Sequence, residues 1–189
     1  MIKKTSPATG AAAVATAAAP SSRLALAARE TALIGVGTTA LALIGQISLP
    51  LPFTPVPVTL GSLAALGVGA VLGSRRGIAS SLLLAALAAV GAPVLAGWSS
   101  GVTASFGYVL GYALAAGLAG RVARSDAGLP TRFALMLIAS SSVFVPGVIW
   151  LKIALGVGWG KAVALGLTPF LVGDVLKAAF MTVVTVKRR

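Results

Sequence analysis

Long apolar stretches, separated by short polar or basic segments, dominate this chain of 189 residues. A helix needs about 20 apolar residues to cross the hydrocarbon core of a bilayer, so such stretches are typical of membrane-spanning helices. Hydrophobic residues make up 58% of the chain and charged residues only 10%. The sequence therefore predicts an all-α, polytopic membrane protein, a bundle of six transmembrane helices. The expected spans are residues 31–49, 58–73, 77–96, 102–120, 133–151 and 161–186.

The basic residues are distributed unevenly among the segments between these spans. Fifteen lysine and arginine residues against three acidic ones give a formal net charge of +12, which in a soluble domain would suggest nucleic-acid binding. In membrane proteins, basic residues gather in cytoplasmic loops. With a cytoplasmic N-terminus, every basic residue except Lys152, Lys161 and Lys177 falls in a cytoplasmic segment. The pattern predicts that both termini are cytoplasmic and that nucleic acid is not a partner.

The residues that are missing argue against an enzyme. The chain has no histidine, no cysteine and three acidic residues, so we expect no thiol or histidine catalysis, no metal and no cofactor. The string nearest to a phosphate-binding loop, residues 156–162, lacks the first glycine at the required spacing and has Ala162 where Ser or Thr would hold magnesium. We expect this string to form a flexible turn, and any use of ATP to reside in partner proteins.

Three further segments carry local predictions. Residues 1–22 consist mostly of Ala, Thr, Ser and Pro, which predicts a disordered tail before a transmembrane domain of residues 23–189. A signal peptide is the alternative, although no leucine-rich core follows the first lysines. Four prolines in residues 50–57 favour an extended, stiff loop. Pro146, with the serines of residues 140–142, predicts a kink in the fifth span.

Asp174 and Lys177 are the most informative polar residues. They lie three positions apart inside the sixth span and therefore share one face of a helix. An ionisable group at this depth costs at least about 2.5 kcal/mol, so such groups usually face the bundle interior and mark a ligand or ion route. A purely structural ion pair is the alternative. Pro169 suits a first helical turn, which would put the pair in the outer half of the span.

Other polar residues could converge at the same level. Gln46 and Thr59 flank the proline-rich loop, Trp98 and Ser99 lie in the next outer loop, and Tyr108 and Tyr112 are one turn apart on the fourth span. Each of them could equally form a hydrogen bond between helices. Trp98 is also explained by interfacial anchoring, since it falls, like the other tryptophans, near an outer helix end.

Small residues recur at four-residue spacing at the start of the first span. Thr31 and Gly35 belong to one such stripe, and Ala28 and Ala32 form a parallel pair. Stripes of this kind let helices approach closely. They predict either packing inside the bundle or a docking face for another membrane subunit.

Several motifs, in this order, resemble one family. The chain carries QISLPLPFTPVPVTL (46–60), LGSRRG (72–77), GAPVLAG (91–97), GYVLGYALAAGLAG (107–120) and PFLVGDVLKA (169–178). Together they resemble BioY, the biotin-specific substrate-binding subunit of energy-coupling-factor (ECF) transporters, over about residues 25–186. The chain departs from the usual family pattern at Gly61, where a glutamine is common, and in the segments before and at the entry to the fourth span.

The resemblance implies a six-helix protein of the bacterial cell membrane, surrounded by lipid, that binds biotin near its outer face. It implies partners as well: a transmembrane coupling subunit, docked on the small residues of the first helix, and two cytoplasmic ATPase subunits. By the same resemblance, Asp174 and Lys177 would bind biotin. The ureido ring of biotin offers N–H donors and a carbonyl acceptor, and Lys177 could alternatively pair with the valerate carboxylate. The rival interpretation is an autonomous transporter or channel in which these two residues relay protons or ions.

Overall fold

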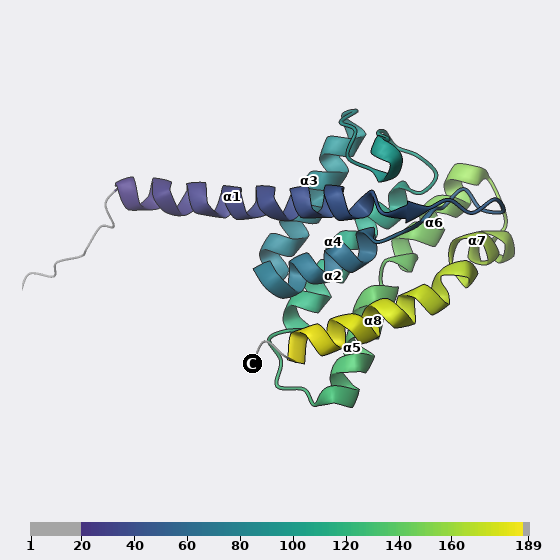
Figure 1. Cartoon of the computed structure of the whole chain (residues 1–189). Coiled ribbons are helices and arrows are strands. Elements are labelled where there is room, and N and C mark those ends of the chain that lie inside the picture. The colour runs from purple at the N-terminus through teal and green to yellow at the C-terminus, as the bar shows by residue number, and fades with distance from the viewer. Residues whose placement is uncertain (1–19, 187–189) are drawn as a thin grey trace, which may run out of the picture.

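The computed structural model describes residues 20–186, and α-helices dominate this part of the chain (Figure 1). The helical fold class predicted from the sequence is therefore confirmed. Besides the helices, the described residues contain a single pair of two-residue strands, β1 and β2. The elements in chain order are α1 (Pro20–Gly45), β1 (Ser48–Leu49), β2 (Val58–Thr59), α2 (Gly61–Leu72), α3 (Ser74–Ala89), η1 (Ala96–Trp98), α4 (Phe106–Val122), α5 (Leu129–Ser141), α6 (Phe144–Leu155), α7 (Trp159–Gly166), η2 (Thr168–Phe170) and α8 (Leu171–Val186).

Among residues 20–186, three helical stretches are long and apolar enough to cross a membrane, namely Arg23–Gly45, Leu129–Leu155 and Trp159–Val186. Two further apolar helices are shorter, Gly61–Leu72 and Phe106–Val122. At 1.5 Å per residue, the 12 residues of α2 extend about 18 Å, less than the hydrocarbon core of a bilayer. Length and composition thus identify a helical membrane protein, as the sequence predicted.

The last two predicted spans are interrupted helices. The fifth breaks between Ser141 and Phe144, which confirms the kink predicted there. Pro146 contributes to this break because it has no N–H to donate to the preceding turn. The sixth consists of α7, η2 and α8, with Pro169 in η2 and the helix proper starting at Leu171. The flexible turn expected at residues 156–162 is wrong from Trp159 onward, where α7 begins.

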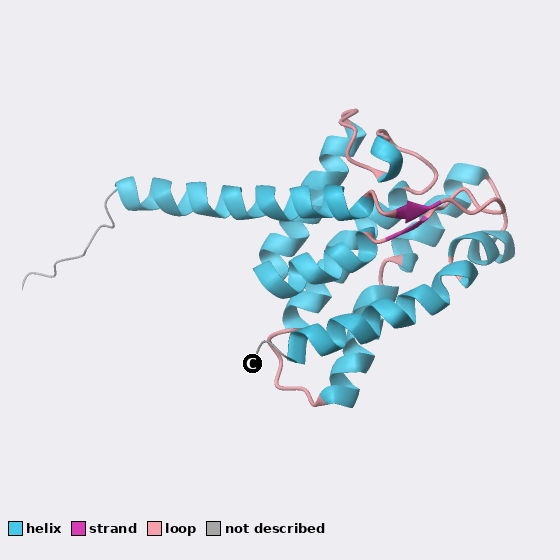
Figure 2. Cartoon of the chain, viewed as in Figure 1, coloured by secondary structure: helices cyan, strands magenta, loops and turns pink. Residues whose placement is uncertain are grey.

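The proline-rich segment forms the tip of a short hairpin, drawn in magenta and pink in Figure 2. β1 and β2 pair antiparallel, with Ser48 opposite Thr59. Residues 50–57 contain no helix, as the four prolines predicted. Thr54 Oγ1 donates a hydrogen bond of 2.8 Å to the carbonyl oxygen of Leu165, which attaches the loop to α7. The third predicted span ends earlier than expected, at Ala89, and Gly91 with φ +96° follows in the loop.

The core forms around α4, which packs against α2, α3, α5 and α6. Glycines allow the closest of these approaches. A Cβ atom added at Gly69 of α2 would overlap the backbone of Ala116 in α4, and one added at Gly120 would overlap the backbone of Ser74. α8 packs against α5 and α2 on the other side. This arrangement brings α4 and α8, which carry half of the predicted substrate-binding residues, into one bundle.

The N-terminal half of α1 extends away from the bundle (Figure 1). Residues 23–32 are exposed, whereas Thr38, further along α1, is buried and donates to the carbonyl oxygen of Ser80 in α3 at 3.1 Å. An exposed ion pair between Arg76 and Glu30, with N–O distances of 2.5 and 2.7 Å, also links α3 to α1. The predicted tail falls outside the described residues as far as residue 19. Its last three residues, 20–22, start α1 instead.

Candidate functional site

A cavity of about 510 Å³ lies where the proline-rich loop, the η1 segment and η2 meet the ends of the helices. Its volume is in the range of pockets that hold small organic molecules. Most of the wall is apolar, and its polar side chains come from β2, α2, α4, α5, α8 and the loop between η1 and α4. Its polar and aromatic residues include Thr59, Ser62, Ser99, Tyr108, Tyr112, Ser140, Phe144, Phe170, Asp174 and Lys177.

Asp174 is buried in the first turn of α8, with 5% of its surface exposed. The Oγ atoms of Ser140 and Ser141 donate hydrogen bonds to Oδ1 and Oδ2 of Asp174 respectively, the second at 2.6 Å. The N-terminal turn of a helix also favours a negative charge, because its free N–H groups carry partial positive charge. Both effects compensate the carboxylate for its removal from water.

Lys177, one turn further along α8, is anchored to a different part of the bundle. Its Nζ donates to the backbone carbonyl oxygen of Thr59 at 2.8 Å and to Ser62 Oγ at 2.9 Å. A lysine ammonium has three N–H groups, so one more is available for a ligand. Within the described residues, Asp174 and Lys177 do not form an ion pair with each other.

Three aromatic rings form one side of the cavity. Tyr108 lies edge-on to Phe144 at 6.4 Å between ring centroids and tilted against Phe170 at 6.5 Å. The Tyr108 hydroxyl donates to the carbonyl oxygen of Gly166 at 2.7 Å. A Cβ atom at Gly147 would overlap the Tyr108 ring, so the glycine makes room for it. The ring is therefore fixed in place and offers an apolar, stacking surface to the cavity.

Tyr112 also faces the cavity, one turn along α4 from Tyr108. Its hydroxyl is 3.4 Å from Thr59 Oγ1, and a Cβ atom at Gly61 would overlap this hydroxyl. Gly61 thus allows the tyrosine to approach the start of α2. Gly61, where the family commonly has glutamine, therefore matters for the position of Tyr112, because a larger side chain would displace the tyrosine.

Six of the eight predicted substrate-binding residues line the cavity, and two do not. Gln46 hydrogen-bonds through Nε2 to the carbonyl oxygens of Ala42 and Leu95, and its Oε1 accepts from the backbone N–H of Trp98. The glutamine thereby attaches the η1 segment to the end of α1. Trp98 is 58% exposed and outside the cavity wall, whereas Ser99 lies on it.

Several residues that line the cavity or contact Asp174 were not among the predicted binding residues. Ser140 and Ser141 appeared in the sequence only as part of a kink, and Ser62 and the two phenylalanines gave no separate signal. Phe170 is four residues before Asp174, so helical spacing puts it one turn away on the same side. That spacing could have identified it, whereas Ser62 and Phe144 reach the cavity only through tertiary packing.

The cavity combines one acceptor group and one cationic donor in an apolar, aromatic enclosure. Among residues 20–186 no cluster of three or more His, Cys, Asp or Glu side chains could hold a metal ion. Such a site suits reversible binding of a small organic molecule with its own donors and acceptors.

The predicted docking residues lie on the projecting part of α1. Ala28, Thr31 and Ala32 are exposed, and a Cβ atom added at Gly35 would meet nothing within 4 Å. Gly35 is half-buried, close to the point where α1 meets α3.

Comparison with known proteins gives consistent matches along nearly the whole chain. A model of the BioY family matches residues 11–189. The probable biotin transporter BioY of Pyrococcus horikoshii is 33% identical over 157 residues, covering 83% of this chain and 94% of the relative. The biotin transporter BioY2 of Lactococcus lactis is 31% identical, covering 80% of this chain and 85% of the relative.

The fold also matches a solved structure. The S-component for biotin from an ECF-type ABC transporter superimposes with a TM-score of 0.73 over 87% of this chain and 94% of that protein, at 23% identity. The two proteins therefore share a fold. From the extent of the family match, the chain belongs to the BioY family.

Proposed function

We propose that this chain is a biotin-binding membrane subunit for biotin uptake, of the kind that works with an ECF transporter. The observation that carries the proposal is the cavity in which Asp174 and Lys177 both face an aromatic wall. The names of the relatives, biotin transporters in several organisms, support biotin as the substrate.

The chemistry of biotin fits the groups on the wall. A ureido N–H can donate to the Asp174 carboxylate, which keeps free lone pairs after accepting from the two serines. The third N–H of Lys177 can donate to the ureido oxygen or to the valerate carboxylate. The thioether ring and the valeryl chain suit the rings of Tyr108, Phe144 and Phe170, because burial of apolar surface favours binding.

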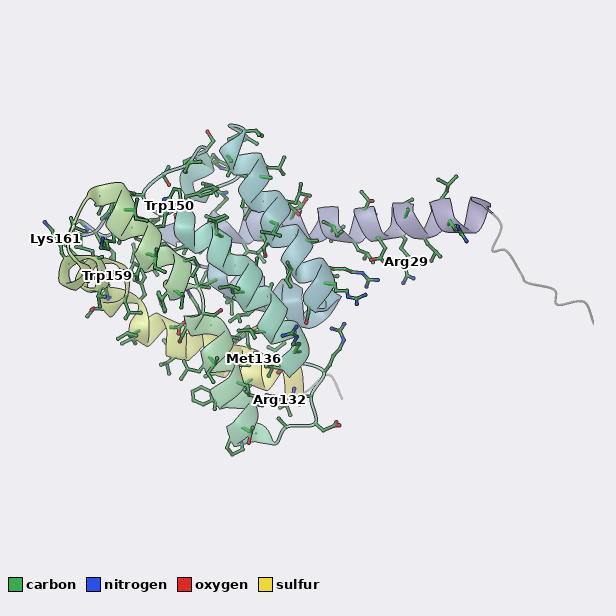
Figure 3. All side chains as sticks on the ribbon, turned by 180° about the vertical axis from the view of Figure 1, so that it is seen from behind. Arg29, Arg132, Met136, Trp150, Trp159 and Lys161 are labelled. Carbon is green, nitrogen blue, oxygen red and sulfur yellow. The ribbon has the colours of Figure 1, made fainter. Side chains whose placement is uncertain are left out.

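The proposal includes an orientation in the membrane. We infer six spans, with α5–α6 and α7–α8 each acting as one interrupted span, and both termini on the cytoplasmic side of a bacterial cell membrane. Trp150, Trp159 and Lys161 lie at the end of the bundle opposite to Arg29 (Figure 3). Tryptophans at one end and arginines at the other support this orientation, in which the cavity opens outward.

Energy for uptake would come from partner subunits. The sequence carries no phosphate-binding loop, so a transmembrane coupling subunit and two cytoplasmic ATPases would drive release of biotin inward. The exposed small residues Ala28, Thr31 and Ala32, with Gly35, provide a surface for the coupling subunit. Small residues allow close helix packing in lipid, where the hydrophobic effect does not drive helices together.

Uptake of labelled biotin tests the proposal against an autonomous transporter. Cells that produce this chain are compared with and without the coupling-subunit and ATPase genes. We expect biotin to accumulate when those subunits are present and to exceed the background level clearly. Accumulation without any coupling-factor gene, abolished by a protonophore, would contradict the partner-driven mechanism and favour the proton relay at Asp174 and Lys177.

A further inference from the structure

Three consecutive serines at the end of α5 have different partners. Ser140 and Ser141 donate to the two oxygens of Asp174 in α8. Ser142 donates back to the carbonyl oxygen of Ala139, within its own turn, at 2.7 Å. Two of the three hydroxyls therefore act on the binding cavity, and the third does not.

The position of Asp174 explains why donors are needed there. Asp174 is buried, and the serines that contact it belong to the C-terminal turn of α5. Two hydroxyl donors replace part of the water that the carboxylate loses on burial.

The two hydroxyls also fix the direction of the carboxylate. One bond to each oxygen prevents rotation of the carboxylate about the bond to Cβ, since any rotation lengthens both hydrogen bonds. Ser140 and Asp174 both line the cavity, so the remaining lone pairs have access to a ligand. With both hydroxyl protons directed at Asp174, this corner of the cavity presents acceptors rather than donors.

We propose that Ser140 and Ser141 are positioning residues for ligand recognition: they hold the Asp174 carboxylate so that it accepts an N–H of the ureido ring. This inference rests on the proposed function, because it takes biotin as the ligand. The serines at the break between α5 and α6 would then orient a hydrogen-bond acceptor for the ligand, in addition to forming part of the kink.

Equilibrium binding of radiolabelled biotin to purified protein tests the inference. Hydrogen bonds to a charged group are among the stronger ones, so removal of both hydroxyls in Ser140→Ala/Ser141→Ala should weaken binding at least about tenfold. Ser142→Ala is the matched control and should change the affinity less than about twofold, since its hydroxyl stays within its own helix. Ser141→Thr keeps a hydroxyl and should retain most of the affinity.

A double-mutant cycle distinguishes positioning from a direct or structural role. In an Asp174→Ala background, the two serine substitutions should weaken biotin binding by less than a further factor of about two, because the carboxylate that they orient is absent. An equal loss in both backgrounds would overturn the inference, since the serines would then contact biotin or support the fold independently. Unchanged binding in the wild-type background would overturn it as well.

Two further comparisons apply if the double variant does not fold or if the wild-type protein does not bind biotin. If the double variant does not purify as a monodisperse protein, the comparison of Ser141→Ala with Ser141→Thr at this half-buried position carries the test. Equal affinity of those two variants would contradict the inference. Failure of the wild-type protein to bind biotin would instead refute the proposed function, which separates the two claims.

Discussion

Replacement of Lys177 by methionine removes the ammonium and retains an apolar side chain of similar length. In the structure, Nζ of Lys177 donates to Thr59 and Ser62, and its third N–H is free for a ligand. Loss of one hydrogen bond from a charged donor costs roughly 1.5–3 kcal/mol, so the dissociation constant for biotin should rise roughly 10- to 150-fold. Lys152→Met is the matched control, because Lys152 lies over the Trp159 ring, outside the cavity wall.

Isothermal titration of both variants with biotin and with biotin methyl ester measures the effect and its origin. If Lys177 pairs with the valerate carboxylate, the ester should bind the wild type more weakly, and Lys177→Met should affect the ester little. If Lys177 donates to the ureido oxygen, the substitution should weaken acid and ester equally. Wild-type affinity of Lys177→Met for both ligands would refute the assignment of Lys177 to the binding site.

Three other substitutions test separate parts of the structure. Ala32→Trp should spare biotin binding but reduce co-purification with the coupling subunit, and unchanged co-purification would contradict the docking surface. Gly147→Ala should lower both thermal stability and biotin affinity, because its methyl group would displace Tyr108. Overpacking of this kind typically lowers the free energy of unfolding by about 1–3 kcal/mol. Gly160→Ala is the control and should be neutral, because the space around Gly160 is open. Arg76→Gln should leave biotin affinity unchanged and lower thermal stability only at low salt, since its ion pair with Glu30 is exposed; a large, salt-independent loss measured by thermal unfolding would contradict this.

The features of the fold that the sequence predicted well are those that depend on local chemistry. Apolar stretches in a chain with few charges indicate helices in a membrane, because backbone groups in lipid must hydrogen-bond internally. The prolines at residues 50–57 exclude helix by themselves, and Pro146 with the adjacent serines indicated the break between α5 and α6. These signals need no knowledge of the tertiary structure.

Helix boundaries were less predictable. Apolar residues continue from α3 into the following loop, so hydropathy alone placed the end of the third span at residue 96 instead of Ala89. The start of α1 was also missed, because alanine, serine and proline near residue 20 are compatible with a tail or with a first helical turn. In both cases composition did not distinguish between two backbone conformations.

The candidate site, too, was predictable from the sequence only in part. Asp174 and Lys177 were identifiable because ionisable residues in an apolar span are rare and costly. Their partners were not, since Ser140, Ser141 and Ser62 meet them only after α5 and α2 pack against α8. Gln46 does not line the cavity, because its side chain hydrogen-bonds to the η1 segment.

Ligand retained by the purified protein tests the central claim most directly. The chain is extracted in mild detergent from cells grown with biotin, and bound small molecules are identified and counted by native mass spectrometry. We predict one biotin per chain in the wild-type protein and a clear loss of retained biotin in Lys177→Met. A protein that retains no biotin, and that does not take it up when biotin is added, would contradict the account.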